Sequence, residues 1–482
     1  MTITRLVTFG SVLALTLPAA ISREKDEAFQ GVQQSVRQRT GKDVRWEQDE
    51  AARAANLQDA RMLLRKPLTV NSAVQIALLN NRNLQATFED IGLSAADLRE
   101  ASTLPNPTFS GSLRVPNRPP SLADYELGTA IDFLNILALP LRKRVAQEQL
   151  RAASLRVADE TISLVAEVKG AFYTLQAAQQ LLGRLKLIVE TNAAALQLAQ
   201  AQHGAGNITD LALAQQQATY SQSRFDVATT EAEIRQDREK IDELLGLWGA
   251  DTDWMLTDNL PPVPASDSSS RRLETLAVSQ RLDLAAAYSD VVTLVNALGL
   301  SKSFRFFGVL DFGFDYERQS ENAGQAIRGP NVTVMVPIFN QGQPRIARSE
   351  AALRRAERRL EAKAIEIRST VRKLQAQMEN KRQIARYYQS ELLPERIAIL
   401  NAMLLQYNAM ISGAFDLFIA KRDEADAERN YVEAARDDWI ARAQLERAVG
   451  GNLEPRQPQS GKSQSVSNQI GKGSRSGKSN QR

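Results

Sequence analysis

Two glutamates in the last quarter of the chain have a spacing that could act on passing ions. Glu391 and Glu395 flank Pro394 and stand four residues apart, so a helix would place both carboxylates on one face. A proline within a helix removes a backbone hydrogen bond and favours a kink. In an oligomer, such carboxylates repeated around a narrow throat would attract cations and repel anions. An exposed acidic pair on an outer helix face is the alternative.

Residue types that usually perform enzyme chemistry are scarce in this chain. It has 482 residues, no cysteine and one histidine, His203, which excludes disulfides, thiolate zinc sites and histidine-cluster metal centres. There is no phosphate-binding G-x-x-x-x-G-K motif, no Rossmann glycine pattern and no H-E-x-x-H motif. The net charge of +4 gives no indication of a nucleic-acid partner. We therefore predict no enzyme activity, no cofactor and no metal site, with His203 a solvated turn residue.

The stretch from Phe304 to Tyr316 has the clearest pattern, because every even position is apolar or glycine and charged residues occupy several odd positions. Alternate residues of a strand point to opposite faces. The stretch exceeds a usual globular strand of about five or six residues and suits a tilted membrane crossing of about nine to eleven. A strand of a soluble sandwich is the alternative. We predict that the lipid-facing residues are Phe306, Leu310, Phe312 and Phe314, with Phe109 and Leu113 of an earlier strand.

The elements around these residues form two successive units of one design, namely a helix, two strands, a very long helix and a return helix. Proline and glycine clusters mark the breaks between them. The frequent alanines and a heptad seam in the second long helix predict close helix packing. The seam consists of Leu360, Ala364, Ile367, Val371, Leu374 and Met378. The predicted elements are 68–103, 109–115, 125–137, 141–202 and 209–245 in the first unit, and 271–300, 304–317, 331–339, 343–407 and 414–449 in the second.

A constant offset between matching residues indicates an internal duplication. Residues of the first helix recur 200 positions later, and residues of the following strand and long helix recur 201 positions later. The matches are Ala77, Leu84, Ala86 and Asp90 with Ala277, Leu284, Ala286 and Asp290, and Gly128, Arg144 and Ala146 with Gly329, Arg345 and Ala347.

The ends of the chain differ in composition from its body. Residues 1–20 have the basic start, the apolar run and the small residues of a secretory signal peptide. Beyond them no run of eighteen apolar residues predicts a spanning helix, and an exported protein of this kind can still enter an outer membrane as a closed β-barrel. The predicted division is 1–20 signal peptide, 21–67 N-terminal periplasmic segment, 68–250 first repeat, 251–270 linker, 271–450 second repeat and 451–482 disordered basic tail.

Between residues 68 and 450 the chain resembles the TolC-type outer-membrane efflux channels. The matching features are Leu104-Pro105-Asn106-Pro107-Thr108-Phe109, Arg281-Leu282-Asp283-Leu284, where the family usually has Arg-Pro-Asp, and two glycine-then-aspartate turns. The sequence departs from the family pattern at Leu282, and its second turn lacks the second glycine of the first. The turns are Gly204-Ala205-Gly206-Asn207-Ile208-Thr209-Asp210 and Gly413-Ala414-Phe415-Asp416.

The resemblance implies a mainly helical fold with a small β part. Three copies would each give four strands to a 12-stranded outer-membrane barrel and two long hairpins to a periplasmic tunnel. It also implies a passive exit duct for substrates delivered by an inner-membrane pump, with RND-type efflux of drugs or heavy metals as one option. A type I protein secretion duct and a coiled-coil periplasmic scaffold are the alternatives. A periplasmic adaptor protein would contact the hairpin tips at Gly204, Gly206, Asp210, Gly413 and Asp416. The glycines of both tips would allow left-handed backbone conformations and the close approach of this partner.

Overall fold

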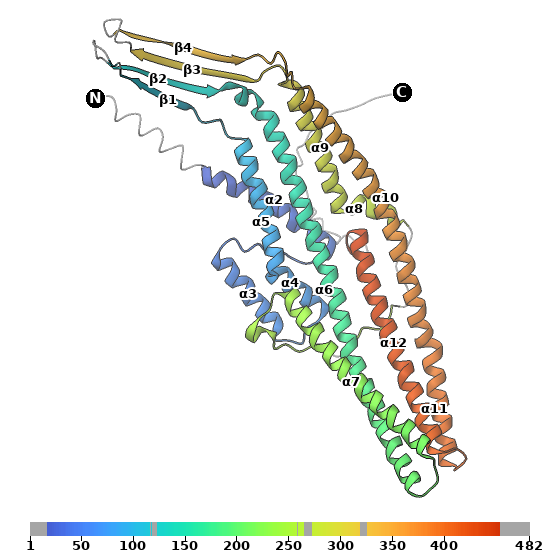
Figure 1. The fold of residues 1–482 in the computed structure, drawn as a ribbon. Coiled ribbons are helices and arrows are strands. Elements are labelled where there is room, and N and C mark those ends of the chain that lie inside the picture. The colour runs from blue at the N-terminus through green and yellow to red at the C-terminus, as the bar shows by residue number, and fades with distance from the viewer. Residues whose placement is uncertain are drawn as a thin grey trace, which may run out of the picture.

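The computed structural model describes residues 17–115, 117, 123–257, 259–264, 272–318 and 325–453. It is an elongated bundle of helices with a four-stranded sheet at one end and the tips of two helical hairpins at the other (Figure 1). Residues 1–16 of the predicted signal peptide lie outside the described residues, as do residues 258 and 265–270 of the predicted linker and the predicted tail from residue 454 onward.

The N-terminal segment forms two helices, α2 (Leu17–Thr40) and α3 (Glu50–Leu64). The side chain of Asp49 caps α3 by accepting a hydrogen bond from the backbone N–H of Ala52. Apolar residues of this segment belong to the main core. Val36 and Trp46 are buried, and the Phe29 ring contacts the Trp46 ring at a centroid distance of 5.4 Å.

The predicted first helix of each unit is divided in two by a single residue with extended backbone angles. The first becomes α4 (Val70–Asn80) and α5 (Arg82–Ala101), and the second becomes α8 (Leu273–Gln280) and α9 (Leu282–Ser303). Asn81 has φ −63° and ψ 121°, and Arg281 has φ −66° and ψ 126°. The Asn81 side chain accepts from the N–H of Leu84 and so caps α5. The two breaks stand 200 residues apart, the same offset as the matching residues of the predicted duplication.

Helix α9 is rich in apolar residues, but Asp283 and Asp290 interrupt them. For this reason the helix contains no run of eighteen apolar residues. Among the described residues it is the one helix that is long and apolar enough to cross a membrane, with a mean hydropathy of 1.3. Only 17% of that window is buried within the single chain. Since α9 packs against α6 and α10, we assign it to the helical bundle.

The first hairpin consists of α6 (Phe133–Gly204) and α7 (Asp210–Leu245), followed by a short 3₁₀ turn, η1 (Gly249–Thr252). At 72 residues α6 spans about 108 Å. It begins earlier than predicted, because the Asp132 side chain accepts from the N–H of Asn135 and starts the helix. Residues 133–137, which we predicted as strand, are therefore helical.

The second hairpin consists of α10 (Gln343–Tyr387), the π-helical turn η2 (Tyr388–Leu392), α11 (Leu393–Asn408) and the return helix α12 (Ala414–Val449). Pro394 lies in the first turn of α11, directly after η2. A π turn is a common way for a helix to accommodate a residue that interrupts the regular hydrogen-bond ladder. The predicted heptad seam is confirmed, since Ile367, Val371 and Met378 are buried in a cluster with α12.

The four strands form one antiparallel sheet in the order β1-β2-β3-β4. Their bounds are β1 Thr108–Arg114, β2 Asp124–Asp132, β3 Val309–Arg318 and β4 Ala326–Met335. Several predicted strand boundaries were wrong, and β4 ends at Met335 where residue 339 was predicted. Phe304 ends α9 and starts a turn, so β3 begins at Val309. β4 begins five residues before Asn331 because the edge strand accommodates Pro330, which cannot donate to a ladder.

Candidate functional site

The sheet has one apolar face and one polar face, and the register extends this division across all four strands. Phe109, Thr129, Phe314 and Pro330 form one continuous row of paired residues. Paired residues of an antiparallel sheet share a face, and every second row falls on the same side. The apolar face contains Phe109, Leu113, Leu127, Ile131, Leu310, Phe312, Phe314, Pro330, Val332 and Val334.

The structure places five of the six predicted lipid-facing residues on this apolar face. Phe109 and Leu113 on β1 are 79% and 69% exposed in the single chain. Phe314 lies midway along β3, whereas Leu310 lies at its start beside the helices. Phe306 was predicted wrongly as a strand residue. It lies in the turn after α9, where the Arg305 guanidinium is 4.1 Å from the centre of its ring.

The opposite face of the sheet carries acidic residues in directly paired positions. Asp132 is paired with Asp311, and Glu126 with Glu317. Like charges directly opposite each other destabilise a sheet, so these pairs indicate a face that water and counterions reach. On the same face Asp315 accepts from Asn331 Nδ2 at 2.8 Å.

The sheet also has two edges without a strand partner among the described residues, the outer sides of β1 and β4. Their unpaired N–H and C=O groups can pair with another chain. The four strands therefore form a sheet with one apolar and one acidic face and with an edge on each side that could pair with further strands.

The first hairpin tip is polar and has the predicted glycine conformation. Gly206 has φ +75°, a conformation that favours glycine, while Gly204 ends α6 without such a value. His203 Nε2 lies 2.6 Å from Asp210 Oδ1 across the turn, so this histidine is a turn residue with a carboxylate partner. The Thr209 side chain caps α7 by accepting from the N–H of Ala212.

The second tip differs from the prediction. Gly413 has φ −78° and ψ 159° and precedes α12, where its N–H donates to Asp416 Oδ2 at 3.1 Å. The left-handed residue of this turn is Met410, with φ 59°. Met410 and Ile411 are 94% and 76% exposed. Sequence reasoning missed them, although two successive large apolar residues in a turn are the signal that could have identified them.

The candidate gate residues Glu391, Pro394 and Glu395 lie on the exposed surface around η2. Two ion pairs between the helices of the second hairpin flank this segment. On the side nearer the sheet, Arg382 Nε donates to Asp438 Oδ1 at 3.0 Å, and both residues are buried. On the side nearer the tip, Arg396 Nη1 donates to Asp423 at 3.3 Å at a half-exposed position.

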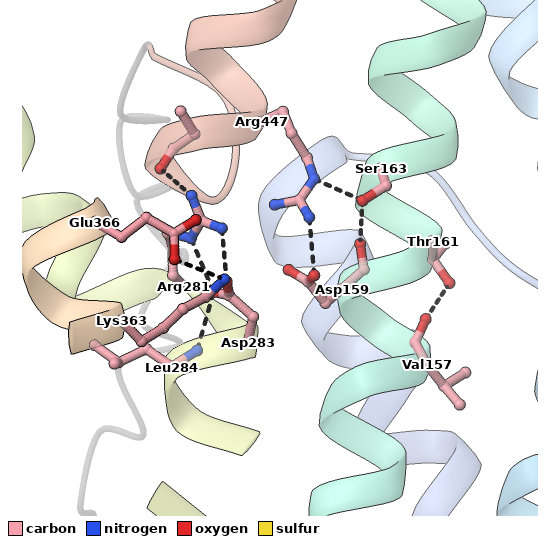
Figure 2. A network of polar contacts seen from close by, with 11 residues as sticks. Val157, Asp159, Thr161, Ser163, Arg281, Asp283, Leu284, Lys363, Glu366 and Arg447 are labelled. Atoms are coloured by element: carbon pink, nitrogen blue, oxygen red, sulfur yellow. Dashed lines mark hydrogen bonds and ion pairs between the residues drawn. The ribbon is translucent and has the colours of Figure 1, made fainter. Parts of the chain in front are cut away.

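A polar network joins the two halves of the chain in the middle of the bundle (Figure 2). Arg281 at the α8–α9 break donates to both carboxylate oxygens of Asp283, at 2.8 and 2.6 Å. Lys363 of α10 lies 3.2 Å from the same carboxylate. Burial acts to raise the pKa of Asp283, but the hydrogen bond and charge of Arg281, with those of Lys363, lower this pKa to about 2. Leu282, which stands where the family usually has proline, is buried.

The second part of the network connects α12 to α6. Arg447 Nε donates to Ser163 Oγ at 2.6 Å, and Arg447 Nη2 donates to Asp159 Oδ2 at 2.9 Å (Figure 2). Burial raises the pKa of Asp159, and the charge of Arg447 opposes this effect. These contacts hold the return helix of the second half against the long helix of the first.

Comparison with known proteins gives consistent results. Residues 73–247 match the sequence model of the outer membrane efflux protein family. The cobalt-zinc-cadmium resistance protein CzcC of Cupriavidus metallidurans is 21% identical over 394 residues, covering 80% of this chain and 90% of that protein. Among solved structures, CusC has a TM-score of 0.63 at 18% identity and covers 80% of this chain and 92% of its own. The outer-membrane channel OprN has a TM-score of 0.66 at 17% identity, covering 82% and 92%.

The predicted mainly helical fold with a small β part is confirmed by these structures, which share it over most of their length. Residues 73–247 therefore match the outer membrane efflux protein family in sequence, and the chain shares its fold with solved structures that include the outer-membrane channel OprN.

Proposed function

We propose that the protein is the exit channel of a tripartite efflux system, through which substrates pass from an inner-membrane transporter and a periplasmic adaptor to the exterior. The main support is the two-faced, open-edged sheet at one end of two long hairpins. Four strands cannot close a barrel, and open edges in lipid would leave backbone groups without partners. Three copies would supply twelve strands and pair every edge.

The helical bundle offers a second surface for such a trimer. Helix α9 is strongly apolar, yet within the single chain it leaves Tyr288 and Val295 59% and 49% exposed. A neighbouring copy that covers α9 would remove this apolar area from water. The edges of the sheet and the exposed side of α9 would then belong to one continuous interface between protomers.

Divalent heavy-metal cations are the substrate class that we favour. In the proposed barrel the paired carboxylates Asp132–Asp311 and Glu126–Glu317 would face the lumen, and three copies would give rings of negative charge that favour cations. The similarity to a cobalt-zinc-cadmium resistance protein supports the same choice. Among the described residues no cluster of three or more His, Cys, Asp or Glu side chains could hold a metal ion.

The hairpin tips are the proposed adaptor contact. The tips differ in chemistry, since the first contains Gly206 and the His203–Asp210 pair and the second exposes Met410 and Ile411. Gly206→Val should impair export and leave trimers assembled, because a β-branched residue cannot adopt φ +75° without strain. Gly413→Ala should be tolerated because Gly413 has ordinary extended dihedral angles. Normal export by Gly206→Val, measured as cell-associated zinc, would contradict this role of the first tip.

The experiment that tests the proposed function is complementation in a bacterial host without its own channel of this type. The protein would be expressed with its adaptor and pump, and cell-associated zinc, cobalt and cadmium would be compared with retention of a fluorescent drug. We expect heat-sensitive trimers in the outer membrane and lower metal retention. Drug export alone would favour a drug efflux channel, and export of a protein alone would favour a type I secretion duct. Monomers outside the outer membrane would support the scaffold alternative and refute the proposal.

A further inference from the structure

The apolar face of the sheet changes character at the end farthest from the helices (Figure 1). Two tyrosines and two arginines replace the aliphatic and phenylalanine side chains of the middle rows. The outermost row on this face is Leu113, Tyr125, Arg318 and Ala326, and the next is Gly111, Leu127, Tyr316 and Arg328.

These polar side chains are arranged against one another. The rings of Tyr125 and Tyr316 are stacked, with centroids 6.0 Å apart and an interplanar angle of 25°. The Arg318 guanidinium lies 5.9 Å from the Tyr125 ring centre, and its Nη1 donates to Tyr125 Oη at 3.4 Å. The Tyr125 ring therefore contacts both the Tyr316 ring and the Arg318 guanidinium.

The position of this group along the strands suits the boundary between hydrocarbon and water. Rows on one face follow each other at about 7 Å along a strand, and the rows around Phe314 and Phe312 lie directly beneath. Tyrosine and arginine place their carbon frameworks on apolar surface while the phenol or guanidinium reaches water. Aromatic girdles occupy this level in outer-membrane barrels.

We propose that Arg318 and Arg328, supported by Tyr125 and Tyr316, bind the phosphate groups of lipid headgroups at the outer surface of the membrane. A guanidinium can donate two parallel hydrogen bonds to a phosphate, which makes arginine well suited to this ligand. The inference rests on the proposed barrel, in which this face meets lipid. A lipid would contact the arginines with its phosphate and the apolar rows beneath them with its acyl chains. A free phosphate would contact the arginines alone.

The opposite face provides a matched control at the same height. Arg114 is the last residue of β1 and follows Leu113, so its side chain lies on the acidic face. Its Nη2 donates to Glu126 Oε2 at 3.4 Å. Arg114→Gln removes the same charge as Arg318→Gln but from the side of the sheet that we assign to the lumen.

The test is native mass spectrometry of the detergent-purified trimer titrated with dioleoylphosphatidic acid or dioleoylphosphatidylcholine. We expect the wild type to prefer the phosphatidic acid, and each arginine replaced by glutamine to weaken its binding by roughly fivefold. The double variant Arg318→Gln/Arg328→Gln should thus bind about 25-fold more weakly, with phosphatidylcholine binding unchanged. Arg114→Gln should retain the wild-type preference, and inorganic phosphate should not compete.

Three results would overturn the inference, namely equal affinity for both lipids, equal weakening by Arg114→Gln, or an unchanged double variant. If the double variant does not assemble, the single variant Arg328→Gln, at an exposed position, can be compared with Arg114→Gln. Failure of the proposed barrel would appear differently, because the protein would not form membrane-inserted trimers and neither lipid would bind. Intact trimers that bind the two lipids equally would refute the headgroup site alone.

Discussion

Asp438→Asn should destabilise the second hairpin strongly, although it exchanges only one heavy atom. Arg382 and Asp438 lie on α10 and α12 and are 5% and 0% exposed. Arg382 Nε and Nη2 donate to the two carboxylate oxygens of Asp438 at 3.0 and 3.3 Å. Removing the negative charge of Asp438 breaks a buried ion pair, and the loss of one partner from such a pair lowers the free energy of unfolding by about 3–5 kcal/mol.

The neighbouring aspartate provides a control with the same substitution. Asp437 accepts from Lys381 Nζ at 2.8 Å and from the adjacent Arg436, but the Asp437 and Lys381 side chains are 29% and 46% exposed. Ion pairs at such positions contribute about 0–1 kcal/mol, so Asp437→Asn should have a small effect. Both substitutions convert an aspartate of α12 to asparagine, one at a buried ion pair and the other at exposed ones.

The measurement is guanidinium unfolding of the purified protein, followed by helical circular dichroism at one fixed protein concentration, since trimer stability depends on concentration. The double variant Arg382→Met/Asp438→Leu should recover most of the loss, because an apolar pair can replace a buried ion pair. Equal losses of free energy in Asp438→Asn and Asp437→Asn would refute the reasoning, as would a double variant less stable than Asp438→Asn.

Three further predictions concern the barrel, the mid-bundle network and the gate. Phe314→Arg should destabilise the inserted barrel by about 2–4 kcal/mol and reduce trimer insertion, because Phe314 lies midway along the apolar face. Asp315→Arg should insert normally, and equal insertion of the two variants would contradict the face assignment. The pKa of Asp283 is lowered from 3.8 to about 2. The ionised carboxylate therefore contributes about 2 kcal/mol to the free energy of unfolding above pH 3.8, and this contribution is lost as the pH falls toward 2. Acid unfolding of Asp283→Asn should lack this component, and identical pH profiles would disprove it. Glu391→Gln with Glu395→Gln should lower the cation preference of single channels without changing trimer yield, and unchanged reversal potentials would place these glutamates outside the lumen.

The sequence by itself determined the class of fold and the two faces of the sheet. Alternation along a strand is a local property, so Phe312 and Phe314 could be assigned to one face without knowing any partner strand. The heptad seam through Ile367 and Val371 likewise predicted a buried stripe that is confirmed. The long helices could be predicted because few glycines or prolines interrupt these long stretches of sequence.

The tertiary structure decided where elements begin and end and which distant residues meet. Phe306 continues the apolar alternation, yet it lies in a turn because α9 ends at Ser303. Arg382 and Asp438, 56 residues apart, show no sequence pattern that pairs them. Periodicity reports the face to which a side chain points, but the end of an element depends on capping groups, and the pairing of charges depends on how two helices are aligned. For this reason the left-handed residue of the second tip is Met410, where the sequence had indicated Gly413.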